Sequence, residues 1–133
     1  MVRLVIPDVD GTLVTREKVL TERTRAAVGQ MRVAGIEFAI TSGRPPRVMQ
    51  MLIQPLALTT PIAALKMLGI PTDQIATIGD MPNDVAMFER SGVSIAIGQA
   101  NDEVKFAATY CTTSSEEKGF ATAVDRYVLN SRR

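Results

Sequence analysis

The sequence predicts an α/β protein in which a doubly wound parallel sheet lies between two layers of helices, a three-layer α/β/α architecture. Two observations support this prediction. Short runs of mainly apolar residues, many of them β-branched, recur along the chain, as in strands that are buried on both faces of a sheet. Most of these runs lead through a polar loop into a stretch that favours a helix, the order of a right-handed crossover. The 133 residues are enough for one such domain, spanning residues 1–133.

The first strand is predicted over residues 2–6, a β-branched run that is apolar apart from Arg3. The helix that follows is predicted over residues 21–34, with Thr21 placed as its N-cap and Gly35 as its terminator. Its apolar or small residues at helical spacing are Ala27, Val28, Met31 and Ala34.

Further strands are predicted from apolar runs at residues 36–40, 75–78 and 93–97, and from a weaker run at residues 108–112. Helices are expected after the second and third strands, because Pro45 and Pro82 can each occupy the first turn of a helix. A final helix is predicted from apolar residues at helical spacing, namely Phe120, Val124, Val128 and Leu129.

The composition excludes several classes of function. Fifteen basic and fourteen acidic residues leave a net charge of +1 without a basic stripe, so no nucleic-acid partner is expected. The chain has no histidine, which excludes Ser-His-Asp and Cys-His catalysis. Its single cysteine, Cys111, cannot form an intramolecular disulfide, and its initial apolar run is too short for a signal peptide or a membrane span. We therefore expect a cytoplasmic protein without a membrane partner, whose acid–base chemistry depends on carboxylates.

Two carboxylates follow the first predicted strand in the segment Asp8-Val9-Asp10-Gly11-Thr12. Because the extended strand gives way to a loop there, both acids can face one cavity. Two converging acids repel each other unless a hard cation lies between them, and Mg²⁺ is such a cation with a preference for oxygen ligands. The structural alternative is a solvated acidic turn around Gly11.

A second acidic motif, GDMPND at residues 79–84, follows the third predicted strand. Helix capping alone would explain Asp84, which lies in the first turn of the expected helix. Capping does not explain Asp80, which comes at the carboxyl end of the strand. We therefore interpret Asp80 as a further metal ligand.

The segment Thr41-Ser42-Gly43-Arg44 follows the second predicted strand and precedes a helix. A hydroxyl and backbone N–H groups at such a position can bind phosphate oxygens. The alternative is an ordinary Ser-Gly turn with an exposed arginine. Since all three motifs follow strands of a parallel sheet, they are expected to meet in one site at its carboxyl edge.

In this order the three motifs resemble those of the HAD (haloacid dehalogenase-like) superfamily, and GDMPNDVAM resembles its Cof-type, class IIB phosphatases in particular. The resemblance implies that Asp8 is the nucleophile and that Asp10 is the general acid and base. The residues implied to bind phosphate or substrate are Ser42, Gly43, Arg44 and Asn83. Those implied to hold Mg²⁺ are Asp8, Asp10 through its backbone carbonyl, Asp80 and, in support, Asp84.

The function implied by this resemblance is a magnesium-dependent phosphatase that hydrolyses a small phosphorylated metabolite through an aspartyl-phosphate on Asp8. Asp10 would protonate the leaving alkoxide and then activate water. The resemblance does not distinguish among family substrates such as sugar phosphates, flavin mononucleotide and pyridoxal phosphate. It also leaves the oligomeric state open.

The chain departs from the Cof-type pattern where the family's cap domain would lie. Residues 59–64 resemble the strand that leads into the cap and residues 65–70 resemble the end of the helix after it, which predicts a cap deletion near residues 64–65. The family's lysine, usually followed by glycine, has no counterpart at that place, and the nearby Lys66 is more typical of a solvated helix face. The core without its cap is either natural or a truncation.

Two other classes of function remain open. A catalytically weak or inert core would bind Mg²⁺ and phosphate without appreciable turnover, as the missing lysine and cap suggest. A receiver-like phosphoacceptor also uses acids and Mg²⁺, but receivers carry two adjacent acids after the first strand, whereas here the acids alternate as DxD. The lifetime of the phosphoryl adduct distinguishes a hydrolase from such a switch.

Overall fold

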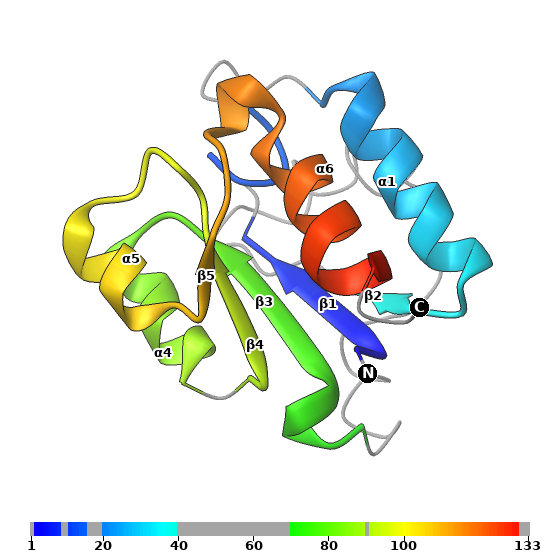
Figure 1. The fold of residues 1–133 in the computed structure, drawn as a ribbon, viewed down its shortest axis with the longest axis horizontal. Coiled ribbons are helices and arrows are strands. Elements are labelled where there is room, and N and C mark those ends of the chain that lie inside the picture. Colours follow the sequence, from blue (N-terminus) through cyan, green and yellow to red (C-terminus); the bar gives the residue numbers. More distant parts are fainter. Residues whose placement is uncertain (1, 9–10, 16–19, 40–69, 90, 131–133) are drawn as a thin grey trace, which may run out of the picture.

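The computed structural model of the chain describes residues 2–8, 11–15, 20–39, 70–89 and 91–130. Within these residues the strands form a five-stranded sheet in the order β2-β1-β3-β4-β5, and each neighbouring pair is parallel (Figure 1). The strands are β1 (Leu4–Pro7), β2 (Glu37–Phe38), β3 (Ile75–Gly79), β4 (Val93–Ala96) and β5 (Tyr110–Cys111). The predicted parallel α/β sheet is therefore confirmed.

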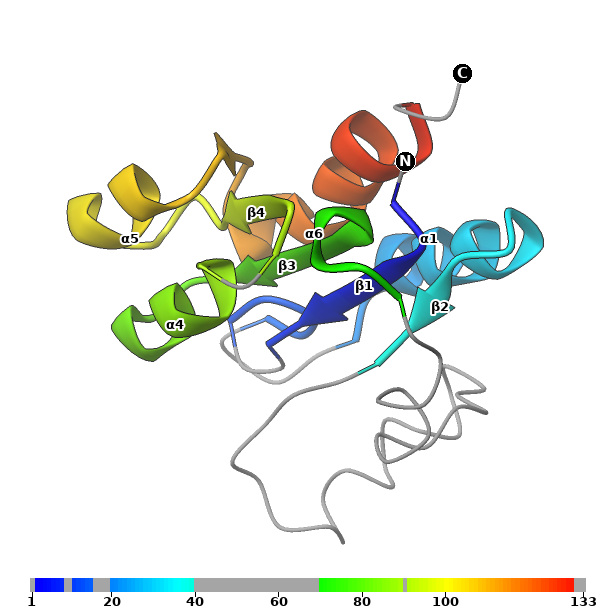
Figure 2. The same cartoon turned by 90° about the horizontal axis from the view of Figure 1, so that it is seen from below.

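The helices of the described residues group in two pairs. They are α1 (Glu22–Val33), α4 (Val85–Phe88), α5 (Asp102–Ala107) and α6 (Gly119–Ala123), with shorter 3-10 helices η1 (Thr72–Gln74), η2 (Pro82–Asp84) and η3 (Ser115–Glu117). The predicted last helix begins as α6 and continues as a π-helix, η4 (Val124–Leu129). Helices α1 and α6 lie together on one side of the sheet and α4 and α5 on the other, and Figure 2 shows the same grouping from below.

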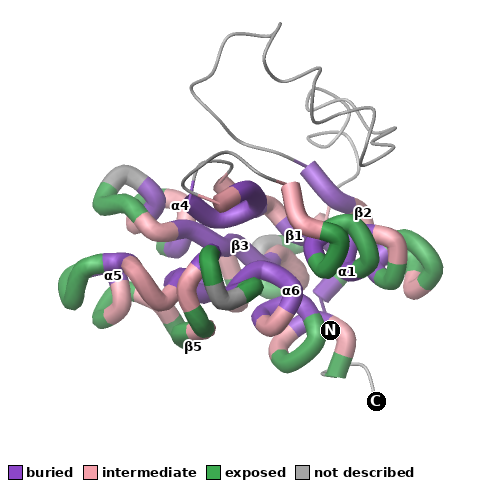
Figure 3. The backbone as a smooth tube through the Cα atoms, turned by 90° about the horizontal axis from the view of Figure 1, so that it is seen from above, coloured by how far each residue is buried: buried purple, intermediate pink, exposed green. Residues whose placement is uncertain are grey.

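Apolar side chains cover both faces of the sheet, which gives the predicted three layers. On β4, Ile95 belongs to the larger core cluster, which includes residues of α1 and α6. The next residue, Ala96, belongs to a smaller cluster with Phe88 of α4 and Val104 of α5. This division follows from the alternation of side chains along a strand. Figure 3 shows mostly buried residues along β1, β3 and β4 and exposed residues on the outer turns of the helices. Both residues of the edge strand β5 are exposed.

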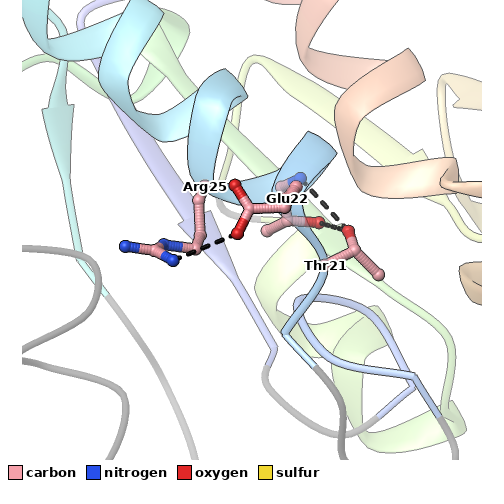
Figure 4. Close-up of polar contacts among 4 residues, drawn as sticks. Thr21, Glu22 and Arg25 are labelled. Atoms are coloured by element: carbon pink, nitrogen blue, oxygen red, sulfur yellow. Dashed lines mark hydrogen bonds and ion pairs between the residues drawn. The ribbon is translucent and has the colours of Figure 1, made fainter.

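Helix α1 begins and ends as the sequence predicts. The side-chain oxygen of Thr21 accepts a hydrogen bond from the N–H of Thr24 at 3.2 Å, so Thr21 is the N-cap (Figure 4). In the first turn, Glu22 forms an ion pair with Arg25 at 3.2 Å. Gly35, just beyond the helix, has a φ of 78°, a conformation that glycine adopts readily. The buried residues of α1 are Thr24, Ala27, Val28 and Met31.

Helix α5 is not among the predicted elements, although local signals for it exist. Asn101 is its N-cap, and the Asn101 side chain accepts a hydrogen bond from the N–H of Val104 at 3.0 Å. The first turn carries Asp102 and Glu103, which are favourable near a helix N-terminus. The helix has only six residues and a single buried one, Val104, so its sequence lacks the apolar repeat on which a helix prediction depends.

Candidate metal and phosphate site

Asp8 and Asp80 lie next to each other at the carboxyl ends of neighbouring strands. Pro7 of β1 is in register with Ile78 of β3, and the N–H of Asp8 continues the pairing by donating to the Ile78 carbonyl at 2.9 Å. Asp80 directly follows Gly79, the last residue of β3. The carboxylates therefore stand side by side because parallel strands end at the same edge of the sheet.

Asp84 returns from the first turn after β3 toward the same point. One of its carboxylate oxygens, Oδ2, accepts hydrogen bonds from the N–H groups of Asp80 and Met81, both at 3.0 Å. The side chain is buried, with only 6% of the residue exposed. Asp84 therefore supports the backbone that carries Asp80, in addition to bringing its own negative charge to the cluster.

The three carboxylates form a cluster with the spacing of a metal site. Asp8, Asp80 and Asp84 each offer one oxygen, and these oxygens all lie within 4.8 Å of one another. Magnesium holds its ligands at about 2.1 Å, so two ligands on opposite sides of the ion are about 4.2 Å apart. An all-oxygen donor set at this spacing suits Mg²⁺, and a cation would also relieve the repulsion among the three acids. The residues thus fit the ion that the sequence predicts.

The loop that follows Asp8 folds closely against Asp80. Its residue Gly11 has a φ of 74°, and a Cβ at this position would overlap the Asp80 carboxylate. The N–H of Leu13 donates to the carbonyl of Asp8 at 3.3 Å, and the buried side chains of Leu13 and Val14 belong to the larger core cluster. The core therefore anchors the loop, while glycine at position 11 gives the Asp80 carboxylate its space.

Gln99 also contacts this site, although the sequence motifs do not single it out as a site residue. It lies just beyond β4, and its side-chain nitrogen donates to the Gly11 carbonyl and, at 3.3 Å, to Asp80 Oδ2. The available signal was its position, because Gln99 is a polar residue following Gly98 at the carboxyl end of another strand.

Several predicted site residues fall outside the described part of the chain. These are Asp10, Ser42, Gly43 and Arg44, together with Lys66 and the predicted cap-deletion point. The backbone of Asn83 lies in η2, next to Asp84. Of the predicted metal ligands within the described residues, the structure brings together Asp8, Asp80 and Asp84.

The sequence model of the haloacid dehalogenase-like hydrolases matches residues 5–65 and 63–124 of the chain. The chain belongs to this family. The sequence resemblance is thereby confirmed at the level of the family. The two matched segments of this haloacid dehalogenase-like chain overlap at residues 63–65.

Part of the chain is also similar to curated phosphatases of greater length. Phosphoglycolate phosphatase from Methanothrix thermoacetophila is 48% identical over 58 residues, which are 44% of this chain and 26% of that protein. The match therefore spans about a quarter of the relative's length.

Solved structures share the fold over nearly the whole chain. A haloacid dehalogenase-like hydrolase from Bacteroides thetaiotaomicron has a TM-score of 0.87 at 16% identity, over 95% of this chain and 99% of that chain. The 3-deoxy-D-manno-octulosonate 8-phosphate phosphatase from Moraxella catarrhalis, in complex with a magnesium ion, a phosphate ion and KDO, has a TM-score of 0.78 at 20% identity. That likeness covers 93% of this chain and 84% of the other. At 16% and 20% identity, these two likenesses establish that the chain shares the fold of these proteins.

None of the helices in the described part of the chain has the length and apolar character needed to cross a membrane.

Proposed function

We propose that the chain is a magnesium-dependent phosphatase that hydrolyses small phosphorylated metabolites. The observation that carries this proposal is the convergence of Asp8, Asp80 and Asp84 from two strand ends and the following turn. Membership of the haloacid dehalogenase-like hydrolases and similarity to a phosphoglycolate phosphatase support the reaction class. The structural neighbour that contains magnesium and phosphate supports the choice of ion. Cytoplasmic localisation stays a prediction from the sequence.

The residues proposed to hold Mg²⁺ are Asp8 and Asp80, with the backbone carbonyl of Asp10 and with Asp84 in support. A bound magnesium ion supplies positive charge that offsets the nucleophile and the phosphoryl oxygens. Within the chain, the two N–H groups that bind Asp84 Oδ2 orient that carboxylate. The Asp84 carboxylate is thus held in place by backbone contacts.

In the proposed reaction, a carboxylate oxygen of Asp8 attacks phosphorus and displaces the alkoxide in line. The O–P bond to Asp8 forms, the ester O–P bond breaks, and Asp10 gives its proton to the departing alkoxide. Asp10 then takes a proton from water, which attacks phosphorus and releases inorganic phosphate. Asp8 is returned as a carboxylate and Asp10 as the acid, so the cycle is balanced.

The phosphate group is proposed to bind Ser42, Gly43, Arg44 and Asn83. These groups offer a hydroxyl, backbone N–H donors, a guanidinium and an amide, a set that suits phosphate oxygens. The substrate class therefore rests on phosphate recognition, and the organic part of the substrate stays open.

The site is proposed to work without a cap domain, in a single domain whose cap has been deleted near residues 64–65. The overlap of the two family matches at residues 63–65 supports this position. The likeness to the Bacteroides thetaiotaomicron protein, which covers 95% of this chain, supports the assignment of residues 1–133 to one core domain.

A weak or inert core is the second candidate function. The specific observation in its favour is that no Lys-Gly pair occurs near residues 64–66. Losing one group that stabilises transition-state charge typically lowers turnover by about a hundred- to a thousandfold. An open site also leaves water in contact with the reacting groups. We therefore expect slow and poorly selective hydrolysis.

The test is phosphate release from an aryl phosphate by the purified chain, with and without Mg²⁺. We expect slow turnover that requires the ion, and Asp8→Asn should reduce it to the uncatalysed background. Asp73→Asn is a matched control, because Asp73 is exposed and lies in η1, before the opposite end of β3. Magnesium binding without turnover would favour the inert core, and a phosphoryl adduct that persists would favour the receiver-like switch.

A further inference from the structure

The side chain of Gln99 connects three segments that are far apart in the sequence. Its nitrogen Nε2 donates to the carbonyl of Gly11, which is 88 residues away, and to Asp80 Oδ2 at 3.3 Å. Its oxygen Oε1 accepts from the N–H of Ser115 at 2.9 Å. Both ends of the amide are thus in use, and Gln99 is half-buried.

These contacts determine which way the amide faces. The N–H of Ser115 can only donate, so the amide oxygen must point toward it. The carbonyl of Gly11 and the carboxylate of Asp80 can only accept while Asp80 is ionised, so the NH₂ group must face them. The reversed amide would place an acceptor against two acceptors and a donor against a donor. Gln99 is therefore held in one orientation.

The segment that holds the oxygen of Gln99 is itself firmly placed. Just before Ser115, the carbonyl of Thr113 accepts from the N–H of Gly98 at 3.0 Å. Across Ser115, the N–H of Gly119 donates to the Ser114 carbonyl at 2.8 Å. These bonds tie both sides of the turn, one of them directly to the residue before Gln99. The amide oxygen thus binds a turn that two further backbone hydrogen bonds hold in place.

The nitrogen of the amide contacts two parts of the proposed site, the loop after Asp8 and the Asp80 carboxylate. Gly11 belongs to the loop that begins at Asp8, and the loop closes on itself through the bond from the Leu13 N–H to the Asp8 carbonyl. Asp80 follows the neighbouring strand β3. One amide nitrogen therefore holds the loop of the proposed nucleophile and a proposed metal ligand together.

We infer that Gln99 is a positioning residue, which sets the distance between the Asp8 loop and the Asp80 carboxylate. This inference rests on the proposed function, since it assigns Gln99 a role at the magnesium site. Its action is indirect: it donates to the Gly11 carbonyl and to Asp80, a proposed metal ligand, and the Ser115 turn keeps it in place. Residues that orient metal ligands in this way typically change metal affinity or activity by about ten- to a hundredfold when they are replaced.

The test compares Gln99→Met with the wild-type chain. Methionine keeps the length and flexibility of the side chain but removes both the donor and the acceptor. The matched control is Gln74→Ala, because the Gln74 side chain accepts an exposed hydrogen bond from Arg3 and lies just before β3, at the end opposite to the site. Three quantities are measured on each protein: magnesium affinity by calorimetry, kcat and KM for an aryl phosphate, and amide hydrogen exchange at Leu13 and Ser115.

For Gln99→Met we expect a magnesium affinity that is about ten- to a hundredfold lower, and a fall in kcat that exceeds any change in KM. Exchange at Ser115 should be about tenfold faster, since the bond that protects this amide is lost. Exchange at Leu13 should also rise, because the loop loses its link to Gln99. The Gln74→Ala variant should match the wild type in all three measurements.

Two results would overturn the inference. Unchanged exchange at Leu13 and Ser115 would show that Gln99 does not hold the loop, whether or not the chain binds magnesium. Faster exchange with wild-type magnesium affinity and kcat would show a purely structural role. Failure of the proposed function would look different, because the wild-type chain itself would then neither bind magnesium nor hydrolyse the aryl phosphate.

Discussion

The carboxyl group of Asp84 occupies the space in which a side chain on Gly79 would stand. A Cβ on Gly79 would lie 2.5 Å from Asp84 Oδ2 and 2.6 Å from the Asp84 Cβ. These separations are far below the usual contact distance between carbon atoms. Since the Asp84 Cβ is fixed directly to the backbone, it cannot move aside as the end of a flexible side chain could.

Gly79→Ala is therefore expected to lower both stability and magnesium affinity. Overpacking of this kind typically reduces the free energy of unfolding by about 1–3 kcal/mol. The displaced Asp84 would also lose its bonds to the N–H groups of Asp80 and Met81, so the metal ligands would shift. Chemical unfolding and calorimetric magnesium titration measure the two effects.

Gly29→Ala is the control for this substitution. Gly29 lies within α1, and a Cβ there would meet nothing within 4 Å. Alanine in a helix interior is more favourable than glycine, by about 0.5–1 kcal/mol, so this variant should be more stable than the wild type. Equal effects of the two substitutions on unfolding would contradict the tight contact at Gly79.

Gly11→Ala is expected to lower both the stability of the chain and its magnesium affinity. The loss of affinity should be larger than that of a variant with the same loss of stability. The positive φ of Gly11 should cost about 1–2 kcal/mol with a Cβ present. The new methyl group would also push against the Asp80 carboxylate, which lies at the end of a side chain and can move away. Stability and magnesium affinity are measured as for Gly79→Ala.

Gly35→Ala separates the effect of the positive φ from that of the overlap with Asp80. Gly35 has a similar φ of 78°, but a Cβ there would meet nothing within 4 Å. We expect a comparable loss of stability and a wild-type magnesium affinity. If Gly11→Ala also keeps the wild-type affinity, the Gly11 loop does not govern the position of Asp80.

Asp80→Asn should lower magnesium affinity by about tenfold or more, because a neutral amide replaces a charged ligand of nearly the same shape. Without magnesium, the same change should leave the chain equally stable or more stable, since it relieves repulsion from Asp8 and Asp84. Calorimetry and thermal unfolding in a chelator measure these outcomes. Asp73→Asn should alter neither quantity, and a magnesium affinity unaffected by Asp80→Asn would remove Asp80 from the metal site.

Asp10→Asn should slow the hydrolysis of alkyl phosphates more than that of aryl phosphates. A phenolate leaves readily without a proton, whereas an alkoxide needs the general acid. The measurement is the ratio of kcat/KM values for one aryl and one alkyl phosphate in the variant and the wild type. Equal losses on the two substrates would exclude Asp10 as the general acid.

The sequence was sufficient to predict the elements whose signals are local. The cap at Thr21 and the terminator at Gly35 are confirmed because each depends on a few neighbouring residues. Mainly apolar runs predicted β1, β3 and β4 because strands that are buried on both faces carry few polar side chains. The short helix α5 was missed because it buries only one residue. The last helix was predicted from its apolar spacing, but that spacing did not predict that its second part, η4, is a π-helix.

The proximity of Asp8 and Asp80 could also be predicted, because the carboxyl ends of parallel strands lie at the same edge of the sheet. The order of the strands and the identity of the residues that join their loops could not. Gln99 reaches Gly11 across 88 residues because β4 lies beside β3 in the fold. Likewise, Asp84 turns back because Gly79 leaves room for it. Such contacts depend on strand register and close packing between distant segments, which local spacing and periodicity do not encode.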